Sequence, residues 1–188
     1  MNKTTLLKPG NYYHVYNRGN AGEILFYRKE NYMYFLRLYF KYMNPVLETY
    51  AWCLMPNHFH FLIRVNDDQS NVSRPFSNLF NTYAKTINRQ EQRYGSLFQK
   101  PFKRIQINSE QYFLDLVLYI HTNPVHHGFV ENLIDYPWTS YFSLLSGKPT
   151  KIQREKTIER FHDKMNFIYC HNEKNSFEKI KKLVGEKY

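Results

Sequence analysis

Apolar and polar residues alternate with a period of two in several short segments of this chain. Such alternation, in segments rich in aromatic and β-branched residues, predicts half-buried strands. Three segments show it clearly, namely Tyr12–Arg18, Leu47–Leu54 and Phe59–Val65. The last two are separated by a short stretch that contains the turn residues 55–57, so we expect a hairpin there. A fourth segment, Leu97–Ile107, alternates weakly and contains Pro101, which restricts it to an edge or bulged strand.

Apolar residues recur at helical spacing in three longer segments, which predicts amphipathic helices. These segments are residues 30–43, 71–93 and 109–122. Ser109 is a suitable N-cap for the third helix, although Tyr112 stands where a capping box would have Glu or Gln. We expect Asn123-Pro124 to end this helix. The order of the elements predicts an α+β fold, an antiparallel sheet with helices packed on one face.

The character of the chain changes after residue 147. Residues 148–188 are highly charged, and their few apolar residues stand at helical spacing. The 188 residues are 43% apolar and 18% aromatic, which is enough for one folded core. We therefore expect one domain over residues 1–147 and a basic, helical C-terminal extension over residues 148–188.

The sequence contains no pattern typical of a membrane or secreted protein. Apolar runs such as Phe113–Ile120 are far shorter than the ~20 residues that cross a bilayer, and the first ten residues lack the apolar stretch of a signal peptide. We expect a soluble, cytoplasmic protein. Cys53 and Cys170 are too few for a disulfide scaffold or a four-cysteine zinc site, so we expect reduced thiols.

The net charge indicates the kind of partner. The chain has 26 Lys and Arg against 16 Asp and Glu, a net charge of +10. A polyanion is the commonest partner of such a surface, and 17 Tyr and 15 Phe supply rings on which unpaired bases can stack. Composition alone equally allows a basic, aromatic-rich protein with no nucleic-acid role.

His58 and His60 begin the third predicted strand. The period of two sends both imidazoles to one face of the sheet and Phe59 to the other, so the two histidines could share one metal ion. The alternative is a pair of surface histidines at a strand start. The adjacent His126 and His127 show that histidines also cluster by chance.

Tyr119 and Asn123 are spaced i, i+4 in the third predicted helix, so they lie on one face of it. Tyr119 is a candidate nucleophile and Asn123 a candidate metal ligand. A phenol has a pKa of about 10, so it needs a cation or a base nearby to attack phosphorus. Two imidazoles and an amide oxygen leave a bound ion its full charge, which suits Mg²⁺ or Mn²⁺, with a zinc-bound hydroxide as the competing possibility. The alternative assigns Tyr119 to the core and Asn123 to the helix end.

Several motifs in a fixed order carry a resemblance to a known family. They are YHVYNRG at 13–19, WCLMPNHFHFLIR at 52–64, GSLFQKPFK at 95–103, YIHTNPVHHG at 119–128 and YPWTSY at 136–141. Together they resemble the single-tyrosine HUH transposases, most closely the branch associated with repetitive extragenic palindromes. The resemblance spans residues 12–145 and implies a ferredoxin-like or palm-like α+β core.

The resemblance implies a role for each matching residue. His58, His60 and Asn123 would hold a divalent metal ion, Mg²⁺ or Mn²⁺. Tyr119 would attack single-stranded DNA near a hairpin, leaving a 5′-phosphotyrosine and a free 3′-hydroxyl. Tyr112, two turns earlier, is the alternative nucleophile. Many members of the wider family form homodimers with exchanged tyrosines, whereas the palindrome-associated branch is more often monomeric, so the resemblance leaves both states open. It also implies a bacterial cytoplasmic protein that associates with the nucleoid when bound to DNA.

Five residues are candidates for DNA contacts, namely Arg18, Asn20, Lys100, Lys103 and Arg104. Gly19 would allow a nucleotide to approach the backbone next to Arg18. The chain departs from the family where His126 and His127 replace the usual Arg-Ala pair, which removes a permanent charge. Three functions are open at this point: a hairpin-directed strand transferase, a domesticated hairpin-binding protein without cleavage, and a phosphodiesterase that uses activated water.

Overall fold

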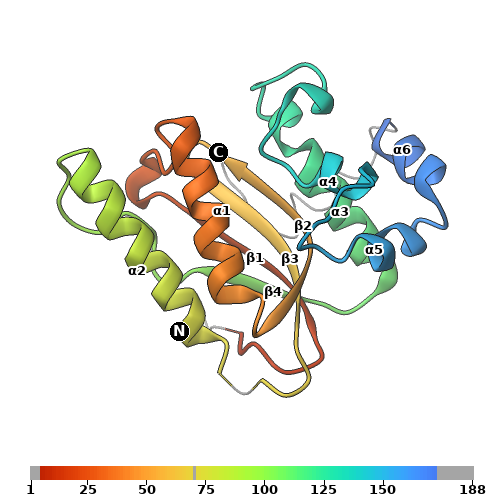
Figure 1. Ribbon diagram of the computed structural model, residues 1–188, viewed down its shortest axis with the longest axis horizontal. Coiled ribbons are helices and arrows are strands. Elements are labelled where there is room, and N and C mark those ends of the chain that lie inside the picture. Colours follow the sequence, from red (N-terminus) through yellow and green to blue (C-terminus); the bar gives the residue numbers. More distant parts are fainter. Residues whose placement is uncertain (1–4, 70, 173–188) are drawn as a thin grey trace.

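The protein is built on one four-stranded antiparallel sheet, with strand order β2-β3-β1-β4 (Figure 1). The computed structural model describes residues 5–69 and 71–172. The strands are β1 (Tyr12–Arg18), β2 (Leu47–Met55), β3 (His58–Val65) and β4 (Lys103–Ile107). The register pairs Met55 with His58, so Pro56 and Asn57 form the hairpin turn that the sequence predicted. The α+β class with an antiparallel sheet is confirmed.

The edge strand β4 is shorter than the predicted segment Leu97–Ile107. Phe98 forms an isolated bridge with Gly19, and regular pairing with β1 resumes only at Lys103. Pro101 lies in the gap between the two paired stretches. Because proline has no N–H to donate to the ladder, it interrupts the strand at this point.

Two long helices, α1 (Lys29–Met43) and α2 (Ser73–Gln90), cover one face of the sheet (Figure 1). Side chains of β3 with odd numbers point toward them, and Phe61 stacks on Tyr39 of α1 with ring centroids 3.9 Å apart. Phe59 packs against Phe35 of the same helix. We call this side of the sheet the α1/α2 face. Its helices follow the predicted segments, because both present a continuous apolar stripe to the strands.

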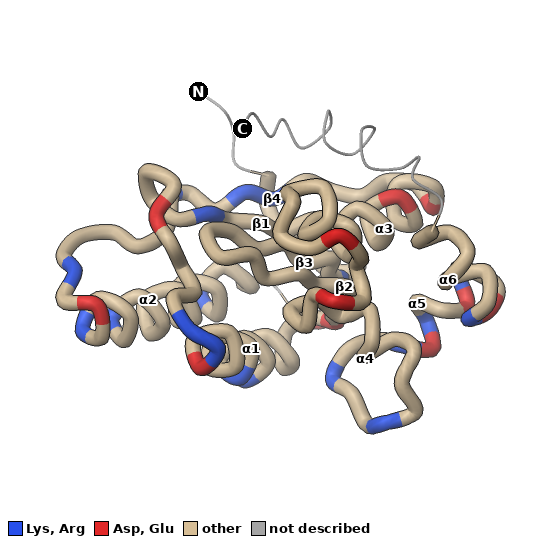
Figure 2. The backbone as a smooth tube through the Cα atoms, turned by 90° about the horizontal axis from the view of Figure 1, so that it is seen from above, with Lys and Arg blue, Asp and Glu red and all other residues tan. Residues whose placement is uncertain are grey.

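The third helix, α3 (Glu110–His126), lies against the opposite face (Figure 2). Even-numbered residues of β3, His58 and His60, meet it there. Helices therefore cover both faces of the sheet, whereas the sequence predicted helices on one. The extra layer follows from α3 itself, which is buried along most of its length and needs an apolar surface on which to pack.

The N-terminus of α3 is the predicted one, but its end is not. Ser109 is the N-cap, and its hydroxyl accepts a hydrogen bond from the N–H of Tyr112. The expected end at Asn123-Pro124 is wrong, because the helix continues through Pro124 to His126. Pro124 has no N–H, so near the end of the helix it removes a single backbone hydrogen bond. The next turn still closes, because the His127 N–H donates to the Asn123 carbonyl.

The rest of the described chain consists of short elements, and those that follow α3 in the sequence pack beside it. It contains two 3-10 turns and three short helices: η1 (Asn20–Gly22), η2 (Leu133–Asp135), α4 (Tyr141–Leu145), α5 (Arg154–Arg160) and α6 (Lys164–Asn172). Phe161 and Phe167 are buried, so residues up to 172 contribute to the core. The part of the predicted C-terminal extension over residues 173–188 lies outside the described residues.

Both cysteines are free thiols, and Cys53 is buried in β2. Within residues 5–69 and 71–172, no helix combines the length and the apolar character that crossing a bilayer requires.

Candidate active site

The strand β3 and the helix α3 face each other through two matched pairs of residues. His58 and His60 are two positions apart on the strand, about 6.6 Å, and Tyr119 and Asn123 are one helical turn apart, about 6 Å. The pairs meet in order, with His58 at Asn123 and His60 at Tyr119. The two elements run in opposite directions, so one face of β3 and one stripe of α3 bring all four side chains together.

The contacts within this group are close. The Nε2 atom of His58 lies 3.2 Å from the Oδ1 atom of Asn123. The ring of Tyr119 meets the ring of His60 edge to face, with centroids 5.5 Å apart and an interplanar angle of 87°. His60, Tyr119 and Asn123 are fully buried, and His58 is 8% exposed. The four predicted site residues therefore lie together in a single chain.

The Nδ1 atoms of both histidines face a second layer of polar residues. His58 Nδ1 is 2.7 Å from the Oδ1 atom of Asn57. His60 Nδ1 is 3.0 Å from Nε2 of His14, a buried residue of β1 whose ring stacks on that of His60. A hydrogen-bond partner on Nδ1 fixes the tautomer and the orientation of the ring, and thereby the direction in which the lone pair of Nε2 points. Asn57 and His14 thus orient the two imidazoles.

The donor set of two imidazole nitrogens and one amide oxygen could hold a divalent cation. With a proton on Nδ1, His58 directs the lone pair of Nε2 toward the amide of Asn123, whose Oδ1 atom is also an acceptor. Two acceptors facing each other are stabilised by a positive charge near both. The Nδ2 atom of Asn123 is buried and has no hydrogen-bond partner among the described residues. If the amide were turned by 180°, Nδ2 would face His58 and Oδ1 would take the buried position without a partner. In either orientation, one of the two amide atoms therefore needs a further partner.

A metal site made only of His, Cys, Asp and Glu side chains is absent from the described part of the chain. No group of three or more His, Cys, Asp and Glu side chains there has the arrangement of a metal site. The set proposed from the sequence has two histidines and one amide. His58, His60 and Asn123 are therefore the residues to test.

Tyr112 lies elsewhere on α3. Among the described residues, its ring makes no contact with the ring of His58 or His60, whereas Tyr119 contacts His60. Burial raises the pKa of Tyr112 above its usual value, which disfavours the phenolate. Because Tyr119 is buried as well, burial does not distinguish the two tyrosines, and the ring contact with His60 is the observation that favours Tyr119 as the nucleophile.

His127 extends the same helix stripe by one more turn. It is the C-cap of α3, and its ring centroid is 5.1 Å from that of His58. His126, by contrast, is exposed. Of the two positions at which this chain departs from the family, His127 therefore lies directly beside His58.

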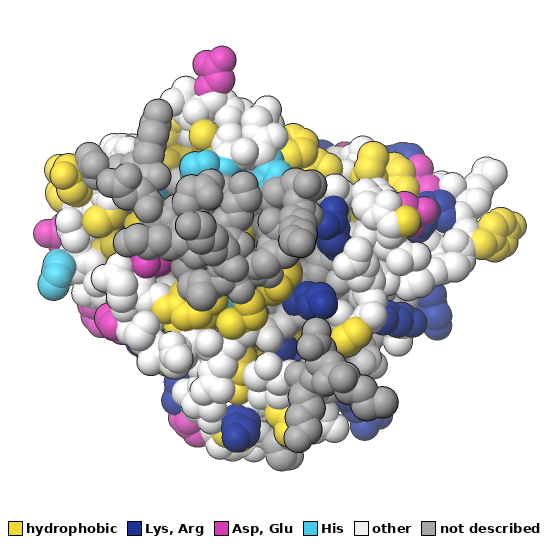
Figure 3. Space-filling model, turned by 180° about the vertical axis from the view of Figure 1, so that it is seen from behind, with side chains coloured by type: hydrophobic (Ala, Val, Ile, Leu, Met, Phe, Trp, Pro, Cys, Tyr) yellow, Lys and Arg dark blue, Asp and Glu magenta, His cyan; other side chains and the backbone are white. Residues whose placement is uncertain are grey.

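Two of the predicted DNA-binding residues share the face of the sheet that carries His58 and His60, which we call the histidine face. Arg18 pairs with His58 in the β1–β3 register, and Lys103 pairs with Tyr16, which stacks on His60. Directly opposed residues of neighbouring strands point to the same face. From behind (Figure 3), histidine side chains are visible at the surface, with Lys and Arg side chains on the same face.

The strand register does not place the other three candidates on the histidine face. Asn20 is exposed in η1, and Lys100 is exposed in the loop before Pro101. Arg104 pairs with Val15 and so points to the α1/α2 face. The predicted DNA-binding residues therefore do not share one surface. Arg18 and Lys103 lie on the histidine face, and Arg104 lies on the α1/α2 face.

Gly19 has an intramolecular reason for its missing side chain. A Cβ atom at this position would lie 1.9 Å from the carbonyl oxygen of Glu23, which folds back over η1. The backbone angle φ of Gly19 is −59°, which any residue can adopt. Close packing within the loop, rather than an unusual conformation, therefore requires glycine here.

No protein-family model matches the chain. Over 103 residues the chain is 28% identical to a Haemophilus influenzae protein named "Putative REP-associated tyrosine transposase", a match that covers 50% of this chain and 58% of that protein. A solved structure of a REP-associated tyrosine transposase bound to a REP hairpin matches with a TM-score of 0.65 and 18% identity, over 82% of this chain and 95% of that chain.

This chain resembles the REP-associated tyrosine transposases. The resemblance read from the spaced motifs is confirmed by the sequence match, and the ferredoxin-like arrangement implied by it is confirmed by the structural match. At 18% identity the structural likeness establishes a shared fold. The matched region spans less than two thirds of the Haemophilus relative.

Three residues of the site were not predicted from the sequence. His14, Asn57 and His127 all contact the histidine pair. One signal was available for His14, because the alternation in Tyr12–Arg18 places it on the same face as Arg18. The sequence marks Asn57 only as a turn residue, and no local pattern connects His127 with His58, which lies far earlier in the chain.

Proposed function

We propose that this protein is a metal-dependent DNA strand transferase that cuts and rejoins single-stranded DNA near hairpin ends through a 5′-phosphotyrosine intermediate. The observation that carries the proposal is the pairing of Tyr119 with His60 and of Asn123 with His58. Proteins similar to this chain are named tyrosine transposases, and one of them is bound to a REP hairpin. These names support the choice of substrate.

Tyr119 would act as the nucleophile. Its phenolic oxygen loses its proton and forms a bond to the scissile phosphorus, while the bond from phosphorus to the 3′ oxygen breaks. The departing 3′ oxygen gains a proton and becomes a free hydroxyl. The phosphotyrosine keeps the energy of the phosphodiester, so attack by a 3′-hydroxyl in reverse rejoins the strand without ATP.

His58, His60 and Asn123 would hold the divalent ion. Bound there, Mg²⁺ or Mn²⁺ supplies Lewis-acid chemistry that stabilises negative charge on a phosphodiester. Asn57 and His14 would keep both imidazoles in the tautomer that presents Nε2 to the site.

The arrangement supports attack within one chain. Tyr119 contacts His60 of its own chain, so no exchange of tyrosines between two copies is needed to assemble the site. Arg18 and Lys103 on the histidine face would contact the backbone phosphates of the bound strand. We therefore propose that a monomer is sufficient for cleavage.

The test is a covalent-adduct assay on hairpin DNA that carries single-stranded flanks. The DNA is labelled at its 3′ end, because the fragment on that side of the cut keeps the 5′-phosphate and becomes attached to Tyr119. After incubation with Mn²⁺, a labelled protein band is expected on a denaturing gel. The band should vanish in Tyr119→Phe and after EDTA, and persist in Tyr112→Phe.

Other outcomes identify the competing functions. Cleaved DNA without a labelled protein band would indicate a phosphodiesterase that uses activated water. A shift of intact DNA on a native gel, with neither cleavage nor adduct in Mg²⁺ or Mn²⁺, would indicate a hairpin-binding protein without chemistry. Either result would contradict the proposal.

A further inference from the structure

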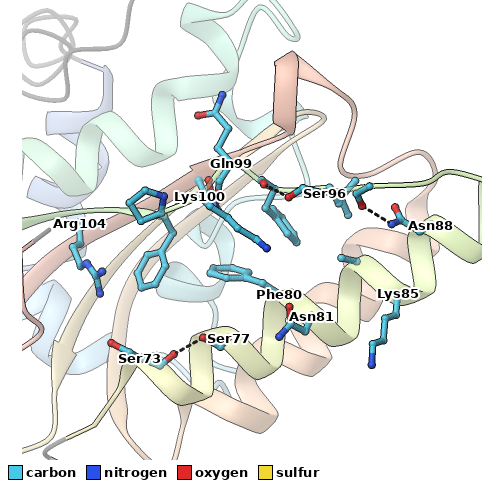
Figure 4. A pocket seen from close by; sticks show the side chains of 17 residues that line it. Ser73, Ser77, Phe80, Asn81, Lys85, Asn88, Ser96, Gln99, Lys100 and Arg104 are labelled. Atoms are coloured by element: carbon cyan, nitrogen blue, oxygen red, sulfur yellow. Dashed lines mark hydrogen bonds between the residues drawn. The ribbon is translucent and has the colours of Figure 1, made fainter. Parts of the chain in front are cut away.

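A cavity of about 590 Å³ lies between α2 and the loop that leads into β4 (Figure 4). It opens on the α1/α2 face at the edge of the sheet, away from His58 and His60. Ligand pockets in proteins have volumes of about 300–1,000 Å³, so this cavity has room for a nucleotide. Nothing in the catalytic proposal uses it.

Aromatic rings form part of the lining. Phe80 on α2 and Phe102 in the loop are partly exposed, with ring centroids 5.5 Å apart, and Phe98 lies behind them. Core phenylalanines are normally covered, so rings that border an open cavity offer apolar surface to a ligand. Flat aromatic faces are the groups on which single-strand binding proteins stack bases.

The charge of the lining is entirely positive. Lys85, Lys100 and Arg104 line the cavity, and no Asp or Glu does so among the described residues. In Figure 4 the Lys100 side chain extends into the space above Phe80, whereas Gln99 points away from it. Such a lining favours a ligand that combines an aromatic surface with negative charge.

Arg104 shows a specific need for an acceptor. Its guanidinium lies 4.3 Å from the ring of Phe102, and its Nε atom is buried without a hydrogen-bond partner among the described residues. Burial also lowers the pKa of Arg104 from its usual value. A buried donor without an acceptor is costly, and a phosphate oxygen would satisfy it with a charge-assisted hydrogen bond.

The cavity is connected to the candidate active site through β1. Asn17 lines the cavity, and its Nδ2 atom donates to the carbonyl of Gln99, while the Gln99 N–H donates to the carbonyl of Arg18. Asn17 and Arg18 are consecutive and point to opposite faces. On the edge strand, Lys103 points to the histidine face and Arg104 to the cavity face. These cations mark a path for a nucleic-acid strand around the edge.

We infer that this cavity binds one unpaired nucleotide of the single strand flanking the hairpin, with its base against Phe80 and Phe102 and its phosphate beside Lys100 and Arg104. The inference rests on the proposed function for its DNA substrate. It adds a second contact region, on the other side of the sheet edge from Tyr119. The cavity would thereby fix the position of the flank relative to the scissile phosphate.

The test measures equilibrium binding in a Tyr119→Phe background, in which the DNA stays intact. The probes are fluorescent hairpins with a 5′ flank, a 3′ flank or no flank, and flanked hairpins with one abasic residue at successive positions. The variants are Phe102→Leu and Lys100→Met. Lys41→Met, at an exposed position of α1, is the matched control for the loss of one positive charge. Thermal unfolding verifies that each variant is folded.

We expect Phe102→Leu to weaken binding of a flanked hairpin by about 5- to 150-fold, the range for loss of one stacked base, without changing binding of the unflanked hairpin. One abasic position should weaken binding by a similar factor, and Phe102→Leu should add no further loss at that position. Lys100→Met should weaken flanked binding more than Lys41→Met does. Equal losses on flanked and unflanked hairpins, or no loss in either cavity variant, would overturn the inference.

The adduct assay with intact Tyr119 separates this inference from the proposed function. If the adduct forms but the cavity variants bind like the control, only the cavity assignment fails. If no adduct forms but the flank-dependent losses occur, the cavity assignment stands and the proposed chemistry fails. Absence of binding to every hairpin overturns both.

Discussion

The Nε2 atom of His58 and the Oδ1 atom of Asn123 lie 3.2 Å apart, although 65 positions separate the two residues in the chain. This contact joins the start of β3 to the last turns of α3. It converts two separate motifs into one polar site.

Removal of the amide at this contact should weaken metal binding. We expect Asn123→Ala to lower the affinity for Mn²⁺ by at least about tenfold, because one oxygen ligand is lost and the loss of even a supporting residue has that effect. The measurement is a titration of free Mn²⁺ by electron paramagnetic resonance. Asn132→Ala, at an exposed position, is the matched control. Unchanged Mn²⁺ affinity in Asn123→Ala would exclude this residue as a ligand.

His14 should act through His60. We expect His14→Phe to lower Mn²⁺ affinity by about 10- to 100-fold, because His60 Nδ1 would lose the partner that orients the ring. His14→Gln keeps an oxygen that can accept from Nδ1–H, so it should recover part of the affinity. The same titration measures both. If His14→Phe and His14→Gln were equally impaired, the hydrogen bond would not be the cause.

Arg18 should contribute a phosphate contact. It faces the same side of the sheet as His58, and its Nε atom is buried without a hydrogen-bond partner among the described residues. We expect Arg18→Met to reduce the salt dependence of single-strand binding, lowering the slope of log K against log salt by about 0.7. Arg37→Met, an exposed arginine of α1, should leave the slope unchanged. Anisotropy titrations at four salt concentrations would measure it.

Gly19→Ala should destabilise the fold. The added methyl group would lie 1.9 Å from the Glu23 carbonyl oxygen and 2.7 Å from its carbon, and both are backbone atoms that cannot turn aside. Overpacking of this kind costs about 1–3 kcal/mol of unfolding free energy, measured by urea denaturation. Gly147→Ala is the control, since nothing lies within 4 Å of a Cβ there. Equal stability of the two variants would contradict the steric explanation.

Acid should destabilise the contact between α3 and α6. His121 Nδ1 lies 2.8 Å from His171 Nε2, and His171 Nδ1 faces the Phe167 carbonyl, so both rings are neutral in the folded protein. Burial lowers the pKa of His171 from 6.5 to about 4 and that of His121 well below its usual value. The unfolded chain therefore binds more protons, and stability is lost as the pH falls from about 6.5 toward 4.

The His171 contribution to this loss is about 2 kcal/mol between pH 7 and pH 5. His171→Gln retains an acceptor and a donor without a titrating ring, so it should show a shallower decrease of unfolding free energy over that range. Urea denaturation at several pH values provides the measurement. His126→Gln, at an exposed position, controls for the loss of one histidine. A wild-type pH dependence in His171→Gln would show that this pair does not govern the acid response.

Much of the fold could be predicted because its patterns are local. The strands β1, β2 and β3 and the helices α1 and α2 follow the period of their own apolar residues to within a few positions. The third helix was predicted to end early, because the effect of Pro124 depends on the turn after it, which the Asn123 carbonyl and the His127 N–H complete. Its packing on the histidine face also required the tertiary structure.

By itself the sequence determined which side chains share a face. A period of two aligns His58 with His60, and a spacing of four aligns Tyr119 with Asn123, whatever surrounds them. Only the tertiary structure decided that this strand and this helix lie against each other, that His14 and Asn57 hold the imidazoles, and that Lys103 and Arg104 point to opposite sides of the edge. The physical reason is range: backbone periodicity acts over a few residues, whereas the pairing of β3 with α3 depends on how the whole core packs.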